Sequence, residues 1–141
     1  MFEELKSLIL SGEEYPIKCD LLVLEKAQEK YGSVDAFEKG LLTWENELDE
    51  NGEKLLEKDG KPKIKGKIPE AGVVLDALYW MINEGEAIIA EKEKRKQVKF
   101  ERESLARRVD LIFTDLALEL HEEFYRCFAV KNVKTTQNPK K

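Results

Sequence analysis

Residues 15–41 read YPIKCDLLVLEKAQEKYGSVDAFEKGL, a strand end followed by two helices with recognisable caps. Apolar residues alternate with polar ones up to Cys19, and the apolar period then changes from two to about 3.6 residues. Asp20 stands at this change, where its carboxylate can accept hydrogen bonds from the first N–H groups of a helix. Gly32 suits the left-handed conformation that ends a helix, and Ser33 is placed to cap a second, short helix.

The residues before this stretch predict a β-hairpin. Residues 5–10 and 15–19 flank the polar linker SGEE, the pattern of two antiparallel strands joined by a short loop that contains glycine. An isolated hairpin is only marginally stable in water. We therefore expect it to pack against the helices that follow or against a third strand.

Residues 51–69, NGEKLLEKDGKPKIKGKIP, contain the turn signals Asn-Gly and Asp-Gly. The region 43–67 is accordingly predicted to be an insertion, either a second hairpin or a mobile loop. Four lysines alternate with other residues and would share one face of an extended chain. This strip could bind an acidic partner, but a soluble edge strand protected from unwanted pairing is the favoured interpretation. The lysines are Lys61, Lys63, Lys65 and Lys67.

The second half of the chain predicts helices. Pro69 suits the first position of a helix over residues 69–83, which is apolar almost all round and so is expected to be buried on several sides. Gly85 either ends this helix or is tolerated within a longer one at a cost of ~1 kcal/mol relative to alanine. The mixed charges that follow are typical of a solvated helical face or a connector. A continuous apolar stripe from Val109 to Cys127 then predicts one last long helix.

Composition favours one domain. The chain has 141 residues, 42% of them hydrophobic, which suffices for one core. We expect a single domain over residues 1–130, with a flexible C-terminal tail over 131–141. The predicted fold class is α+β and mostly α-helical, with a small N-terminal β-hairpin packed on a bundle of four or five helices.

Charge and hydropathy restrict the possible partners and the compartment. The net charge is -5, which disfavours nonspecific binding to nucleic acid. No apolar run approaches the roughly 18 residues of a membrane span, and the N-terminus lacks the features of a signal peptide. A cytoplasmic location is therefore expected, with Cys19 and Cys127 reduced and buried.

The charge is divided unevenly along the chain. Residues 1–60 hold 16 acidic and 7 basic side chains, a balance of -9, while residues 61–141 hold 13 and 17, a balance of +4. This asymmetry would suit head-to-tail association between subunits. Charge balance within one subunit is the favoured alternative.

Motifs for catalysis, metals and nucleotides are missing from the sequence. The only histidine is His121, and Tyr125 stands where the zinc-protease helix motif requires a second one. One histidine and two distant cysteines make no conventional zinc set, and the glycines do not cluster as in phosphate-binding loops. A serine nucleophile has no recognisable base, and enzyme chemistry on paired carboxylates has no specific signature. We expect neither an enzyme nor a cofactor.

Residues 15–41, together with the later segment VVLDALYWMINEGEA (73–87), resemble the tail assembly chaperones of long-tailed bacteriophages and prophages of Gram-positive bacteria. That family has a helix ending of the form L-x-x-L-x-x-x-x-x-x-Y/F-G and then a segment led by Ser or Thr. The resemblance covers about half the chain. The matching residues are Leu21, Leu24, Tyr31, Gly32 and the segment from Ser33 to Glu38.

The resemblance implies a non-enzymatic function in the host bacterial cytoplasm. Such chaperones are thought to coat the tape-measure protein, keep its apolar helices soluble and help tail-tube subunits polymerise around it, without a cofactor. The partners implied are therefore the tape-measure and tail-tube proteins, with no nucleic acid and no membrane. The alternatives are another small prophage structural or interaction protein, such as a head-tail completion component or host-takeover factor, and an enzyme of unrecognised type.

The apolar helices predict the partner-binding surface. Two segments, 73–82 and 109–128, carry more apolar side chains than a small monomer readily hides, so we expect self-association or client binding there. The predicted partner-binding residues are Val73, Tyr79, Trp80, Phe113, Phe124 and Phe128.

Overall fold

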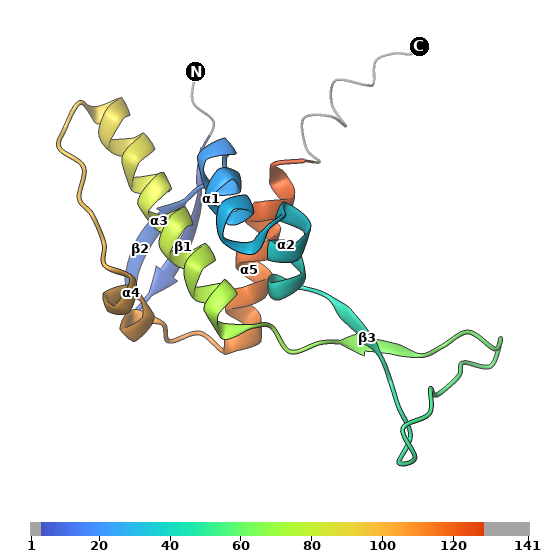
Figure 1. Cartoon of the computed structure of the whole chain (residues 1–141). Coiled ribbons are helices and arrows are strands. Elements are labelled where there is room, and N and C mark those ends of the chain that lie inside the picture. Colours follow the sequence, from blue (N-terminus) through green and yellow to red (C-terminus); the bar gives the residue numbers. More distant parts are fainter. Residues whose placement is uncertain (1–3, 129–141) are drawn as a thin grey trace, which may run out of the picture.

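The computed structural model describes residues 4–128 and is drawn in Figure 1. It confirms the predicted class: within these residues, an N-terminal two-stranded hairpin precedes five helices. The predicted tail at 131–141 lies outside the described residues. The elements are β1 (Lys6–Leu10), β2 (Glu13–Ile17), α1 (Leu21–Tyr31), α2 (Val34–Leu41), β3 (Trp44–Asn46), β4 (Ile64–Gly66), α3 (Ala71–Glu93), α4 (Arg102–Arg108) and α5 (Phe113–Arg126).

The N-terminal hairpin packs one face on α3. β1 and β2 are antiparallel, with Leu8 opposite Tyr15. The side chains that face the helices are buried, and the Lys18 N–H donates to the Met81 carbonyl of α3 at 3.1 Å. The hairpin is therefore stabilised by the helical layer, as its marginal stability in isolation requires.

The predicted caps of the first two helices are confirmed. The Asp20 carboxylate accepts hydrogen bonds from the N–H groups of Leu22 and Val23 at 3.2 and 3.3 Å. Gly32 adopts a left-handed conformation with φ of 88°, and the Ser33 hydroxyl accepts from the Ala36 N–H at 3.0 Å. These bonds join residues close in sequence, so the local pattern is sufficient to predict them.

Helix α3 begins later than predicted and takes the longer of the two courses left open at Gly85. Pro69 lies before the helix, because the Glu70 N–H donates to the Gly40 carbonyl of α2 and Glu70 remains extended as the N-cap. The helix also continues through Gly85 to Glu93. At Gly85 the hairpin crosses the helix so closely that an added Cβ would lie 2.2 Å from the Pro16 carbonyl oxygen.

The prediction of one last long helix is wrong. Helix α4 ends at Arg108, Val109 is extended, and α5 begins only at Phe113. The Arg108 carbonyl accepts from the Ser11 hydroxyl at 2.7 Å, and the Arg108 guanidinium donates to the Tyr15 hydroxyl at 2.6 Å. The end of α4 is thus bound to the hairpin, and the chain turns there.

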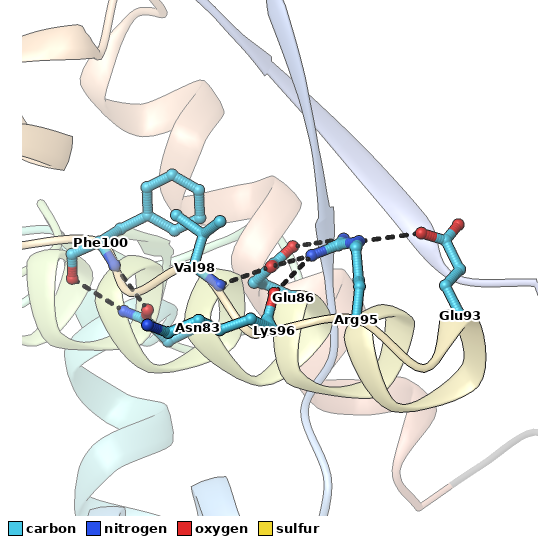
Figure 2. A network of polar contacts seen from close by, with 7 residues as sticks. All are labelled: Asn83, Glu86, Glu93, Arg95, Lys96, Val98 and Phe100. Atoms are coloured by element: carbon cyan, nitrogen blue, oxygen red, sulfur yellow. Dashed lines mark hydrogen bonds and ion pairs between the residues drawn. The ribbon is translucent and has the colours of Figure 1, made fainter.

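An extended segment, residues 95–101, connects α3 to α4 and is called the strap below. Lys94 reverses the chain with φ of 57°, and the strap runs back along α3 (Figures 1 and 2). The Asn83 side chain donates to the Phe100 carbonyl at 3.1 Å and accepts from the Phe100 N–H at 2.9 Å. Glu86 accepts from the Val98 N–H at 2.8 Å. Side chains of α3 therefore supply hydrogen-bond partners to the backbone of the strap at Val98 and Phe100.

The insertion is ordered as an arm, residues 43–68, that projects from the helical body (Figure 1). β3 and β4 pair antiparallel at its base, and two further turns follow at residues 49–52 and 57–60. Of the two alternatives, a hairpin or a mobile loop, the structure shows a branched hairpin.

Candidate protein-binding surfaces

The six predicted partner-binding residues are not gathered on one surface. Val73 and Phe124 lie in the core, only 4% and 3% exposed, so their assignment to a partner surface is wrong for this fold. They close the contacts of α3 and α5 with α2. Phe113 and Phe128 are exposed on or near α5, whereas Tyr79 and Trp80 are half-buried on α3 and line a groove.

This groove lies between α1, α3 and the strap and has a volume of about 420 Å³. We call it the α1–α3 groove. Its lining mixes aromatic and aliphatic side chains with amides and charges of both signs. The apolar lining residues are Leu22, Val23, Tyr79, Trp80 and Phe100.

The floor of the groove is a supported aromatic surface. The Trp80 ring forms this floor and packs against the Phe37 ring, with the two ring centroids 5.9 Å apart. It also packs against the Tyr31 ring, with the centroids 6.5 Å apart. On one rim lies Leu22, in the first turn of α1, with a side chain that is 54% exposed. The floor is thus held in place by the core, while the rim offers apolar surface to a partner.

The opposite wall of the groove is the strap, and polar contacts hold it in place (Figure 2). Besides the paired bonds between Asn83 and Phe100, the Arg95 guanidinium binds Glu86 at 2.7 and 3.1 Å. The bond from Arg95 is the main cause that holds the pKa of Glu86 below its ordinary value. The groove is therefore largely preformed, a usual property of binding sites.

The ionisable groups of the groove include one with an unusual pKa. Burial, and then the hydrogen bond and charge of Asp20, raise the pKa of Glu84 from 4.5 to about 7, while Lys26 lowers it in part. The ammonium of Lys99 and the carboxylate of Glu101 also line the groove. The charge of the groove consequently changes near neutral pH.

The Glu84 pKa predicts a specific pH dependence of stability. Because the folded-state pKa is above the ordinary value, protonated Glu84 stabilises the fold at about pH 4 to 5, and this contribution is lost as the pH rises through 7. Glu84→Gln should therefore reduce the loss of stability between about pH 5 and about pH 8, measured by urea unfolding. Glu29→Gln, at an exposed position of α1, is the matched control. Equal pH profiles for wild type and Glu84→Gln would contradict the expectation.

The arm carries several large exposed apolar side chains, and hydrogen bonds between its strands set its branched shape. At its branch point the Glu47 N–H donates to the Lys63 carbonyl, the Lys63 N–H to the Leu55 carbonyl and the Leu55 N–H to the Glu47 carbonyl, each at 2.9 Å. These three residues are spaced eight apart in the sequence, and each of the two intervening segments forms a turn with a left-handed glycine, Gly52 or Gly60. The arm is therefore a three-way junction of a stem and two short hairpins.

The two cysteines and the histidine make contacts between elements of this fold. Cys19 is buried but Cys127 is exposed, which corrects the prediction that both are buried; both are free thiols. The Cys127 thiol donates to the Cys19 carbonyl at 2.7 Å, and the neighbouring Cys127, followed by burial, raises the pKa of Cys19. His121 is bound to Glu38 of α2 at 2.8 Å. Within residues 4–128, no three His, Cys, Asp or Glu side chains are grouped as metal ligands would be.

Sequence reasoning missed the strap wall and the rim residue Leu22. The strap is recognisable only through its contacts with Asn83 and Glu86, which are far from it in sequence. Leu22 follows Leu21 and precedes Val23, and nothing in this apolar run distinguishes the residue that faces the groove. The weak signal that was available is the alternation of Val98 and Phe100 with lysine.

No family model matches this chain. No curated protein and no solved structure is significantly similar to it. Among the helices of the described part of the chain, none combines the length and hydropathy needed to cross a bilayer.

Proposed function

We propose that this protein is a non-enzymatic tail assembly chaperone of a long-tailed bacteriophage or prophage. In this proposal it binds apolar helical segments of the tape-measure protein and keeps them soluble while tail-tube subunits assemble. The sequence resemblance of residues 15–41 and 73–87 supports the family. The observation that best supports client binding is the preformed α1–α3 groove, with its aromatic floor and its exposed rim residue Leu22.

The dimensions of the groove suit the side chains of a helix rather than a whole domain. A volume of about 420 Å³ lies within the usual range for pockets, and here it would receive apolar anchor residues spaced three or four apart on an amphipathic helix. Trp80 and Tyr79 would contact these anchors from below and Leu22 from the side. The charges of Lys26, Lys99 and Glu101, whose side chains are exposed, would stay at the rim, in contact with water.

The groove also suits temporary binding. An assembly chaperone must release its client, and contacts well below the size of a standard interface give weak, reversible complexes. Binding would also remove water from the polar groups that line the groove, and this cost further lowers the free energy gained by burying apolar surface. A tape-measure protein with many similar helical segments would be coated by many copies, each bound weakly at one segment.

Coexpression with the tape-measure protein of the same genetic element tests the proposal. Wild type should increase the soluble fraction of the client, and Leu22→Gln should reduce this increase, because it removes an exposed apolar contact worth about 1 kcal/mol or more. Leu21→Gln is the matched control: Leu21 is more exposed, at 80%, and lies in the same helical turn, but it does not line the groove. The readout is the amount of client in the supernatant after centrifugation.

Two results would count against the chaperone. The first is client solubility that does not change when this protein is present. The second is an equal loss of activity in the Leu21 and Leu22 variants, which would move the binding surface away from the groove. Gene order is an independent check, since a gene for such a chaperone is expected between the tail-tube gene and a very long tape-measure gene.

A further inference from the structure

The two cysteines of the chain lie in contact, although they are 108 positions apart in the sequence. Cys19 belongs to the connection between β2 and α1, and Cys127 is the C-cap of α5. The Cys127 thiol donates to the Cys19 carbonyl at 2.7 Å, and the two thiols are also within hydrogen-bond distance of each other. The fold therefore brings both sulfur atoms to one place.

The two thiols differ in their access to solvent. Cys19 is only 2% exposed, and its N–H donates to the carboxylate of Glu123 at 2.9 Å, which holds its backbone in place. Cys127 is exposed, and together with Cys19 it lines a pocket of about 300 Å³ beside the start of α1. A small solute can therefore reach the Cys127 sulfur, while the Cys19 sulfur is enclosed and has Cys127 as its neighbour.

The surroundings also make Cys127 the more reactive thiol. The thiolate is the nucleophilic form of cysteine, and an exposed thiol ionises more readily than a buried one. The hydrogen bond from the Cys19 thiol is the main cause that holds the pKa of Cys127 below its ordinary value. Lys18 acts in the same direction, whereas burial and the carboxylates of Glu123 and Asp20 oppose it.

We propose that Cys19 and Cys127 form a reversible disulfide within the native fold, with hydrogen peroxide as the oxidant. Cys127 is the residue that reacts with the peroxide, and Cys19 is the residue that resolves the product. The chain has two cysteines, so Cys19 is the one thiol available for this step within the molecule. Its burial keeps it away from other thiols in solution, which favours the internal bond over a mixed disulfide.

The reaction has two steps. In the first, the Cys127 thiolate attacks one peroxide oxygen, so that an S–O bond forms, the O–O bond breaks and the leaving hydroxide takes a proton from water. The product is a sulfenic acid at Cys127. In the second, the Cys19 sulfur attacks the Cys127 sulfur, the S–S bond forms, the S–O bond breaks, and the hydroxide leaves as water with the proton of the Cys19 thiol. Together, two thiols are oxidised and one peroxide is reduced to two waters.

The positions of both cysteines suit such a bond. A disulfide holds its two Cβ atoms about 3.8 Å apart, so the sulfurs must approach each other further than in a hydrogen bond. Cys127 lies at the end of a helix and Cys19 in a connection, and the approach therefore requires no break in a helix or strand. In a reducing compartment such a bond is transient, since thiol exchange at the exposed Cys127 sulfur releases Cys19 again.

Oxidation of the full-length protein with a small excess of hydrogen peroxide, then alkylation in denaturant and peptide mapping, tests the proposal. Both thiols should be lost, one peptide pair should join Cys19 to Cys127, and dithiothreitol should restore both thiols. The oxidised protein should also unfold at a temperature about 10 °C or more above that of the reduced protein. The reason is that the bond closes a loop across 108 positions and so restricts the unfolded chain.

Single variants assign the two functions. In Cys19→Ala, Cys127 should stop at the sulfenic acid, which dimedone captures. In Cys127→Ser, the buried Cys19 should react with peroxide at least about tenfold more slowly than Cys127 does in Cys19→Ala. Circular dichroism checks the fold of both variants. Cys127→Ser changes an exposed position and should fold as wild type does, so it decides the matter together with wild type even if Cys19→Ala is unstable.

Three results would overturn the proposal. They are the survival of both free thiols after peroxide treatment, a disulfide between the Cys127 residues of two chains, and an oxidised protein that unfolds no later than the reduced one. The inference does not rest on the proposed function. Neither cysteine lines the α1–α3 groove, so its failure would leave the chaperone proposal standing.

Discussion

Gly85→Ala is expected to lower the free energy of unfolding by about 3 kcal/mol or more. Alanine is normally the better helix former, by ~1 kcal/mol, so local propensity predicts the opposite sign. The new Cβ would meet the Pro16 carbonyl oxygen at 2.2 Å, its carbon at 2.6 Å and the Ile17 Cα at 3.0 Å. All three are backbone atoms and no rotamer change relieves them, so the hairpin would have to move away from α3.

Gly72→Ala is the matched control for this prediction. Gly72 belongs to the same helix, and an added Cβ there would have no other atom within 4 Å. This substitution should raise stability by up to about 1 kcal/mol. Urea unfolding followed by circular dichroism compares the two variants. Similar changes in both would show that Gly85 is not a contact point between α3 and the hairpin.

Asp76→Ala is expected to destabilise the protein by about 3 kcal/mol. Asp76 is buried on α3, with a side chain 3% exposed, and binds Lys30 at 2.7 Å, the Tyr31 hydroxyl at 2.5 Å and Arg102 at 2.9 Å. Removing the carboxylate leaves these donors from α1 and α4 without their partner. Lys30 is half exposed and can turn to water, which keeps the loss below that of a fully enclosed ion pair.

The effect of Asp76→Ala should depend on pH. Burial raises the pKa of Asp76, but the bonds from Lys30, Tyr31 and Arg102 outweigh it and hold the pKa below the ordinary value of 3.8. The stabilisation is therefore present above about pH 4 and is lost as the pH falls through the lowered pKa. The difference in free energy of unfolding between wild type and Asp76→Ala should accordingly become smaller at acid pH.

Asp35→Ala is the control for Asp76. Asp35 pairs with Lys39 at 3.1 Å on the surface of α2, where both side chains are mostly exposed. Its removal should change stability by less than about 0.5 kcal/mol. Chemical unfolding near neutral pH measures both variants. A similar loss of stability in Asp35→Ala would contradict the expectation that the buried ion pairs of Asp76 stabilise the fold more than a surface pair does.

The sequence predicted those features that depend on neighbouring residues. The caps at Asp20, Gly32 and Ser33 use hydrogen bonds within two to four residues, so their pattern is complete in the sequence. The fold class followed from the change of period after Cys19. The helix through Gly85 and the break after Arg108 were not predictable, because each depends on the hairpin, which is distant in sequence.

The candidate site was predicted only in part. Tyr79 and Trp80 line the groove, but Val73 and Phe124, which belong to the same kind of apolar stripe, lie in the core. An apolar stripe shows that one face of a helix avoids water, and it does not distinguish the core of the same chain from the surface of a partner. That choice depends on which elements fold over the stripe.

The amino-acid order therefore determined the hairpin, the first two helices with their caps and the predominance of helix, since these follow from backbone hydrogen bonds and local periodicity. Only the tertiary structure decided the length of α3, the position of the strap, the groove above Trp80 and the branched pairing of the arm. Each of these arises where segments far apart in the chain meet, as at Gly85 and Pro16 or at Asn83 and Phe100. Whether a side chain becomes core or surface there depends on packing between elements, which periodicity within one element does not contain.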